Sequence, residues 1–137
     1  MKYLTLGMIC LLAVPAHAGD AAKGENDFKK CVACHAIIAA DGAEIRKGGK
    51  TGPNLFGVIG RPVASYPDYA YGASILAAGA TGAIWDEAAL ADYVANPTLW
   101  LQTTLADDGA KSNMIFKLAK GGEDIAAYLA SVAPAAP

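Results

Sequence analysis

The sequence predicts an all-α domain with about four to five helices. Apolar residues recur at helical spacing in several segments, whereas the strict alternation that is typical of strands is not convincing anywhere. The segments between the helical ones are rich in glycine and proline. We therefore expect helices joined by long turns, and almost no sheet.

The first helix is expected to run from Asp20 toward Cys31. Asp20 is suited to cap this helix, because a carboxylate accepts hydrogen bonds from the free N–H groups of the first turn. Gly24, Phe28 and Cys31 are spaced i, i+4, i+7 and share one face. The spacing therefore predicts a helix whose inner face leads to Cys31.

The clearest helical pattern is "WDEAALADYVANP". Asp86 is the expected N-cap, acidic residues occupy the first turn, and Pro97 predicts the stop. Leu90, Tyr93 and Val94 form its apolar stripe.

Two further helices and one long loop complete the prediction. A helix in "GGEDIAAYLASVAP" should end at Pro134, and a shorter helix fits residues 69–78. The segment "RKGGKTGPNLFGVIGRP" is expected to be loop, because glycine and proline interrupt both periodicities. The apolar face of the last helix contains Ile125, Tyr128, Leu129 and Val132.

Residues 1–18 are predicted to be a secretory signal peptide. Lys2 gives a positive start, residues 4–14 are apolar, and Ala16-His17-Ala18 has the small-x-small pattern of a cleavage site. The apolar run is shorter than the ~20 residues that span a bilayer. We expect residues 19–137 to form a single exported domain, with an uncleaved anchor as the alternative.

The charge of the expected mature chain argues against nucleic-acid binding. Without Lys2, 10 Lys and Arg face 13 Asp and Glu, so the net charge is near −3. Nucleic-acid-binding domains are usually basic. The remaining chain also has no long apolar segment, so we expect a soluble protein that binds no nucleic acid.

The segment "KKCVACHAI" carries the most informative motif, with Cys31, Cys34 and His35. A zinc site would need about four ligands, usually in two pairs, and only one cysteine pair is present. A thioredoxin-like dithiol would follow a strand, but the preceding residues look helical. The spacing Cys-x-x-Cys-His is typical of covalent haem attachment.

Haem attachment also explains the order of the three residues. Each thiol can add to one of the two vinyl groups of the porphyrin, and the following imidazole can then bind the iron. Export agrees with this reading, because bacterial c-type haem is attached outside the cytoplasm. The sequence therefore predicts one covalently bound haem c on Cys31 and Cys34, with His35 as a metal ligand.

Met114 is the expected second metal ligand. Once the leader is removed, His35 is the only histidine and Met114 the only methionine. A lone methionine is more often a core residue, and a lysine could coordinate only after losing a proton. Met114 is favoured because no other soft ligand remains, and a thioether ligand raises the reduction potential.

At this point the chain resembles the class I c-type cytochromes, and within them the soluble bacterial cytochrome c2 group, relatives of mitochondrial cytochrome c. The resemblance covers nearly all of residues 20–132. It implies the cytochrome c fold, in which the helices wrap around one covalently bound haem. It depends on five blocks in the family order: "GENDFKKCVACH", "KTGPNLFGVIGR", "WDEAALADYVANP", "KSNMIFKL" and "EDIAAYLASV".

The resemblance implies further roles around the cofactor. The Pro53 carbonyl would accept a hydrogen bond from the His35 ring, and Tyr93 would hydrogen-bond the Met114 sulfur. Gly24 and Phe28 would meet the C-terminal helix near Ile125 and Tyr128. Tyr93 and Trp85 could instead be ordinary core residues. The residues implied to face the haem propionates are Arg61, Tyr71 and Trp85.

Two segments are longer than in mitochondrial relatives, "IIAADGAEIRKGGK" and "LQTTLADDGAKSN". We expect both to be loops that border the haem crevice, so partner choice should not be transferred from the shorter proteins.

The resulting hypothesis is a periplasmic, monomeric one-electron carrier, and not an enzyme. It would serve membrane redox complexes: a quinol–cytochrome reductase, an oxidase, a denitrification reductase or a photosynthetic reaction centre. The acidic residues Asp86, Glu87 and Asp92 should lie far from the exposed haem edge, although these charges could also form a solvated face without direction. Lysines expected at that edge are Lys29, Lys30, Lys50, Lys111, Lys117 and Lys120.

Three other functions stay open at this stage. A haem peroxidase or nitrite-type reductase needs an open iron and an acid–base residue, and a ligand-binding sensor needs an easily displaced ligand. The absence of a second histidine after residue 18 argues against the enzyme. A dedicated subunit of a larger dehydrogenase is compatible with the sequence.

Overall fold

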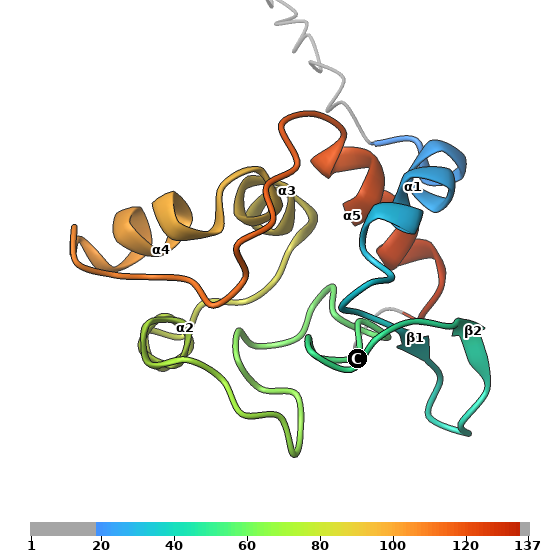
Figure 1. The fold of residues 1–137 in the computed structure, drawn as a ribbon, viewed down its shortest axis with the longest axis horizontal. Helices are drawn as coiled ribbons and strands as arrows, with labels where there is room; N and C mark the ends of the chain where they lie inside the picture. The colour runs from blue at the N-terminus through green and yellow to red at the C-terminus, as the bar shows by residue number, and fades with distance from the viewer. Residues whose placement is uncertain (1–18, 135–137) are drawn as a thin grey trace, which may run out of the picture.

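The computed structural model describes residues 19–134, so the predicted signal peptide lies outside the described residues. Five α-helices, one 3₁₀ turn and a two-stranded hairpin make up this part of the chain (Figure 1). The predicted all-α class is confirmed. In chain order the elements are α1 (Ala21–Asp27), η1 (Phe28–Lys30), β1 (Ile37–Ile38), β2 (Glu44–Arg46), α2 (Ala73–Ala80), α3 (Glu87–Ala95), α4 (Pro97–Leu105) and α5 (Gly122–Ser131).

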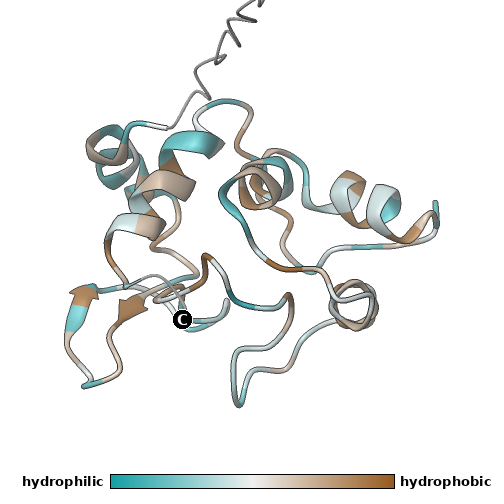
Figure 2. Cartoon of the chain, turned by 180° about the vertical axis from the view of Figure 1, so that it is seen from behind, coloured by the Kyte–Doolittle hydropathy of each residue, from teal (hydrophilic) through white to brown (hydrophobic). Residues whose placement is uncertain are grey.

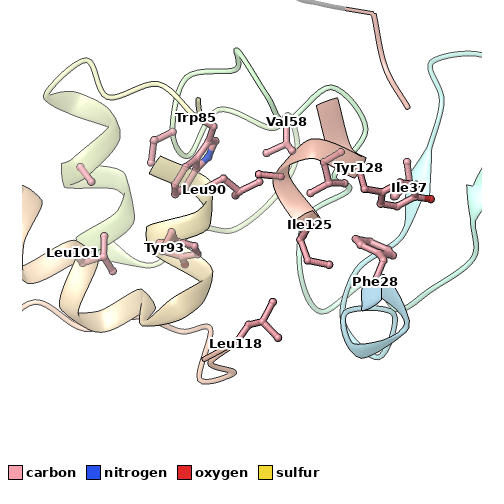
Figure 3. Packing of buried hydrophobic residues seen from close by; sticks show 14 of the residues in the cluster. Phe28, Ile37, Val58, Trp85, Leu90, Tyr93, Leu101, Leu118, Ile125 and Tyr128 are labelled. Atoms are coloured by element: carbon pink, nitrogen blue, oxygen red, sulfur yellow. The ribbon is translucent and has the colours of Figure 1, made fainter. Parts of the chain in front are cut away.

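The two ends of the domain meet where α1 packs on α5. Gly24 allows the close approach, because a Cβ at this position would collide with the backbone carbonyl of Asp124. Phe28 is fully buried, and its ring centroid lies 5.6 Å from that of Tyr128. The expected contact between this face and the C-terminal helix is therefore confirmed, and Figure 3 shows both rings beside Ile125.

A buried carboxylate joins the first turns of the same two helices. Asp124 is 5% exposed and accepts hydrogen bonds from the Asp20 backbone N–H, at 2.8 Å, and from the Lys23 ammonium. The Asp20 carboxylate in turn accepts from the N–H groups of Ala22 and Lys23, as expected for an N-cap. The ion pair with Lys23, followed by the Asp20 N–H, holds the pKa of Asp124 below its ordinary value.

The core continues from α5 to α3 and α4. Asp86 caps α3 by accepting a hydrogen bond from the Ala89 N–H at 2.7 Å, as predicted. The rings of Trp85, Tyr93 and Trp100 then form one aromatic cluster, with centroids 4.9–5.5 Å apart. Figure 3 shows Leu90 and Tyr93 on the α3 side of the core. One continuous apolar cluster thus links the two halves of the fold.

The prediction missed α4. Pro97 was read only as a stop, and α3 does end just before it, but the same residue begins the next helix. Proline fits the first helical position because its missing N–H would have no partner there. Asn96 supplies the cap, since its side-chain oxygen accepts from the Leu99 N–H at 3.2 Å. The expected loop "LQTTLADDGAKSN" is therefore helical as far as Leu105.

The ends of the other predicted helices differ from the observed ends by a few residues. The helix expected over residues 69–78 is α2, which begins at Ala73 and ends at Ala80. The only paired strands among residues 19–134 form a short antiparallel hairpin, in which Ile37 faces Arg46. This hairpin lies in residues 37–50, the first of the two segments that are longer than in mitochondrial relatives. Its small size agrees with the expectation of almost no sheet.

Figure 2 shows hydrophilic residues at the start of α5 and hydrophobic residues further along the same helix. This distribution matches the burial of Ile125 and Leu129 in the core. None of the helices between residues 19 and 134 has the length and apolar character needed to cross a membrane.

We expect the replacement Asp124→Asn to destabilise the protein most strongly near neutral pH. A carboxylate whose pKa is depressed by folding stabilises the folded state above the unfolded-chain pKa, about 4. This stabilisation is lost as pH falls through the lower folded-state pKa. Urea unfolding of the haem-loaded protein between pH 7 and pH 2 measures the effect. The free energies of unfolding of Asp124→Asn and of the unchanged protein should become equal at the acid end.

Glu123→Gln is the matched control, because Glu123 is an exposed acid in the same helical turn. It removes the same charge from the start of α5 without removing a buried ion pair. A loss of stability as large in this control, or a pH-independent loss in Asp124→Asn, would contradict the prediction.

Candidate functional site

The segment from Cys31 to His35 forms one tight turn directly after η1. The N–H groups of Cys34 and His35 both donate to the Cys31 carbonyl, at 3.1 and 2.9 Å. Both thiols are free; Cys31 is half-buried against the core and Cys34 is exposed. The turn thus places two sulfurs and an imidazole on one short stretch of backbone.

Burial raises the pKa of the Cys31 thiol to about 11, an effect that Lys30 opposes only in part. A reactive dithiol needs the opposite shift, because the thiolate is the nucleophile. This environment does not favour the thioredoxin-like alternative.

The ring of His35 is oriented by a backbone carbonyl. Its Nδ1 lies 2.8 Å from the oxygen of Pro53. A carbonyl can only accept, so Nδ1 carries the proton and Nε2 keeps its lone pair free for a metal. Burial lowers the pKa of His35, while the bond to Pro53 raises it to a smaller extent. The imidazole is therefore held neutral, which is the form that binds iron.

The glycine-rich loop packs directly against this turn. The Gly49 N–H donates to the Val32 carbonyl and the Gly52 N–H to the Cys34 carbonyl, both at 2.8 Å. A Cβ on Gly52 would overlap the ring of His35. Glycine is required here because the backbone of the loop passes so close to the histidine.

Met114 lies in the segment that connects α4 to α5. Its side chain is half-buried and packs against the apolar core. Its backbone N–H donates to the hydroxyl of Ser112 at 3.1 Å. Figure 1 shows this segment, in orange, beside α2 and α3, whereas the Cys31–His35 turn lies in the other half of the fold, near α1 and β1.

The Tyr93 hydroxyl contacts Ser112, and its expected hydrogen bond to the Met114 sulfur stays a prediction. The Tyr93 hydroxyl lies 3.3 Å from the Ser112 oxygen, and burial raises the pKa of this tyrosine. Ser112 was not identified from the sequence; its only signal was a hydroxyl residue two positions before the methionine.

The three residues implied to face the propionates lie in well-packed positions. Arg61 donates to two backbone carbonyls, those of Asn54 and Phe56, at 3.2 and 3.3 Å. The Tyr71 hydroxyl accepts from the Tyr66 N–H at 3.1 Å. Trp85 is 6% exposed within the aromatic cluster. Their roles toward propionates stay predictions.

The donor set fits a haem. Two thiols on one turn match the two vinyl groups of the porphyrin. The free Nε2 of His35 and the thioether of Met114 are both uncharged ligands that haem iron accepts. Cys31 and Met114 also border the same apolar core, which suits a large apolar ring.

Comparison with known proteins identifies close relatives, although no protein-family model matches the chain. The chain is 60% identical over 122 residues to a cytochrome c2 of Rhodobacter capsulatus, covering 89% of each sequence. It is 50% identical over 136 residues to a cytochrome c-550 of Paracoccus denitrificans, covering 96% of this chain and 87% of the relative.

Solved structures give the same result. The crystal structure of the Rhodobacter capsulatus cytochrome c2 superposes with a TM-score of 0.82, covering 83% of this chain and 98% of the other. The cytochrome c-550 of Paracoccus versutus, 49% identical, also gives a TM-score of 0.82, over 85% of this chain and 99% of the other.

We expect Ser112→Ala to let external ligands reach the iron faster in the haem-loaded protein. The change removes the acceptor of the Met114 N–H and the partner of the Tyr93 hydroxyl. A hydrogen bond contributes about 1 kcal/mol, so cyanide should displace the predicted methionine ligand roughly 5-fold faster. Stopped-flow mixing of the ferric protein with cyanide measures this rate.

A double-mutant cycle with Tyr93→Phe tests whether the tyrosine hydroxyl acts through Ser112 or bonds to the Met114 sulfur directly. If Tyr93 acts through Ser112, the two changes are not additive, because each removes the same contact. Additive effects on the cyanide rate would show instead that Tyr93 supports the sulfur directly.

Proposed function

The protein belongs to the c2 group of class I c-type cytochromes, electron-transfer proteins with one covalently attached haem c, and we propose that it is a soluble one-electron carrier of the periplasm. In this proposal residues 1–18 direct export and residues 19–137 form the functional domain. The carrier is a monomer and shuttles electrons between membrane redox complexes. The candidates are a quinol–cytochrome reductase, an oxidase, a denitrification reductase and a photosynthetic reaction centre.

His35 and Met114 are proposed as the two axial ligands. The observation that carries this assignment is the hydrogen bond from the His35 ring to the Pro53 carbonyl, which leaves Nε2 free and fixes the ring. The bound haem supplies iron that gains and loses one electron. With both ligands in place, substrates are excluded and little has to move during transfer.

The ligands and their surroundings favour the reduced state. A thioether is a soft donor that raises the reduction potential. Burial acts in the same direction, because the oxidised centre carries one more charge and a low dielectric disfavours it. Arg61, Tyr71 and Trp85 would face the propionates and keep this region closed to water.

The charge distribution supports docking at a membrane complex. All six lysines that we assign to the rim are exposed, as are Asp86, Glu87 and Asp92 on and before α3. Ile115, next to Met114, is 89% exposed. An apolar side chain among cations is suited to a transient contact with an acidic partner. The rim lysines are Lys29, Lys30, Lys50, Lys111, Lys117 and Lys120.

Met114→Ala tests the proposed ligation. The ferric protein should show an absorbance band near the red edge of the spectrum that reports the iron–sulfur bond, and this band should disappear in the variant. Carbon monoxide should then bind rapidly to the ferrous form, because the sixth position has opened. Met114 as core filler alone would leave the band unchanged, and rapid carbon monoxide binding by the unchanged protein would contradict the carrier function.

We expect electron transfer from a membrane quinol–cytochrome reductase to become slower as the ionic strength rises. Exposed charges are screened over about 10 Å at 0.1 M salt, so steering by the lysines weakens as salt is added. Stopped-flow reduction between 10 and 300 mM salt, about 30 to 6 Å in screening length, measures the rate. Lys117→Glu should flatten the dependence. Lys47→Glu is the control, because Lys47 is an exposed lysine that we do not assign to the rim. A rate indifferent to salt would refute steering.

A further inference from the structure

We propose that Asn54 is a positioning residue for His35. Its side chain clamps the segment that carries the Pro53 carbonyl onto the segment that follows the histidine. The inference rests on the proposed function, because it assigns a role toward the axial ligand.

The Asn54 side chain forms a reciprocal pair of hydrogen bonds with one residue of β1. Its oxygen accepts from the Ile38 N–H at 2.9 Å, and its amide nitrogen donates to the Ile38 carbonyl at 2.8 Å. A side-chain amide thus occupies the position that a backbone peptide group holds in a strand pair. Asn54 is half-buried, so both bonds lie away from most of the solvent.

Backbone bonds extend the same contact on both sides. The Gly52 N–H donates to the Cys34 carbonyl at 2.8 Å, and the Leu55 N–H donates to the Ala36 carbonyl at 3.0 Å. Residues 52–55 therefore run beside residues 34–38, and the bond between His35 and Pro53 lies within this pairing.

The position of Pro53 explains why a side chain is needed. Proline has no N–H, so it cannot donate to the neighbouring segment. The Pro53 carbonyl and the Asn54 N–H belong to one planar peptide unit. Fixing Asn54 therefore fixes the direction in which the Pro53 oxygen points, and with it the bond to His35.

Asn54 is itself held from two further directions. Its side-chain oxygen also accepts from the Phe56 N–H at 3.1 Å, which closes a tight Asx turn. Its backbone carbonyl accepts from Arg61 at 3.2 Å. These contacts hold both the side chain and the backbone of Asn54, so the orientation of the Pro53 carbonyl is fixed as well.

The test measures hydrogen exchange of the His35 Nδ1 proton by NMR in the ferrous, haem-loaded protein. Asn54→Ala removes two bonds to Ile38, each contributing about 1 kcal/mol. The exchange of the ring proton should therefore rise at least about tenfold. The reduction potential should also shift upward, because a weaker bond to Pro53 makes His35 a poorer donor to ferric iron.

Asn96→Ala is the matched control. Asn96 is another half-buried asparagine whose side chain accepts a backbone N–H, but it caps α4. It should lower stability without changing the ring-proton exchange or the potential. Asn54→Gln, which keeps the amide on a longer side chain, should recover part of the slow exchange.

The outcomes separate this inference from the proposed function. Suppose that the unchanged protein shows the iron–sulfur band and a slowly exchanging ring proton. If Asn54→Ala then matches Asn96→Ala in ring-proton exchange and in reduction potential, the positioning role is overturned and the carrier function stands. If the unchanged protein shows neither signal, the proposed ligation itself fails.

A measurement on the unchanged protein applies even if Asn54→Ala does not mature. Under increasing denaturant, the ring proton of His35 and the amide proton of Ile38 should become exchangeable through one shared opening. Two separate openings would overturn the clamp.

Discussion

The hydrogen bond between the His35 ring and the Pro53 carbonyl is the constraint on which the site depends. It selects the tautomer and aims Nε2, while burial of the ring keeps the imidazole neutral. The bond exists because Gly52 lets the loop pass against the ring. A short stretch of backbone therefore defines the chemistry of the centre, and the helices serve to hold that stretch in place.

The proposed second ligand, Met114, depends on different elements. α3 supplies Tyr93, and Ser112 links the tyrosine hydroxyl to the backbone of Met114. Tyr93 also belongs to the aromatic cluster in which Trp85 is buried. The two proposed ligands thus come from separate halves of the fold that share one apolar core.

Local signals in the sequence were sufficient for most of the fold and for the haem-attachment motif of Cys31 and Cys34. Asp20 and Asp86 mark the starts of α1 and α3 because capping is a short-range interaction. α4 was missed because Pro97 both ends one helix and begins the next. The contacts of Asn54 with Ile38 and of Ser112 with Tyr93 were not predictable, since they depend on segments 16 and 19 residues apart meeting in space.

The contact between Gly24 and the Asp124 carbonyl has a consequence for the order of folding. α1 gains its packing partner only when the last helix has been synthesised, so the backbone around Cys31 and Cys34 lacks this support until the polypeptide is almost complete.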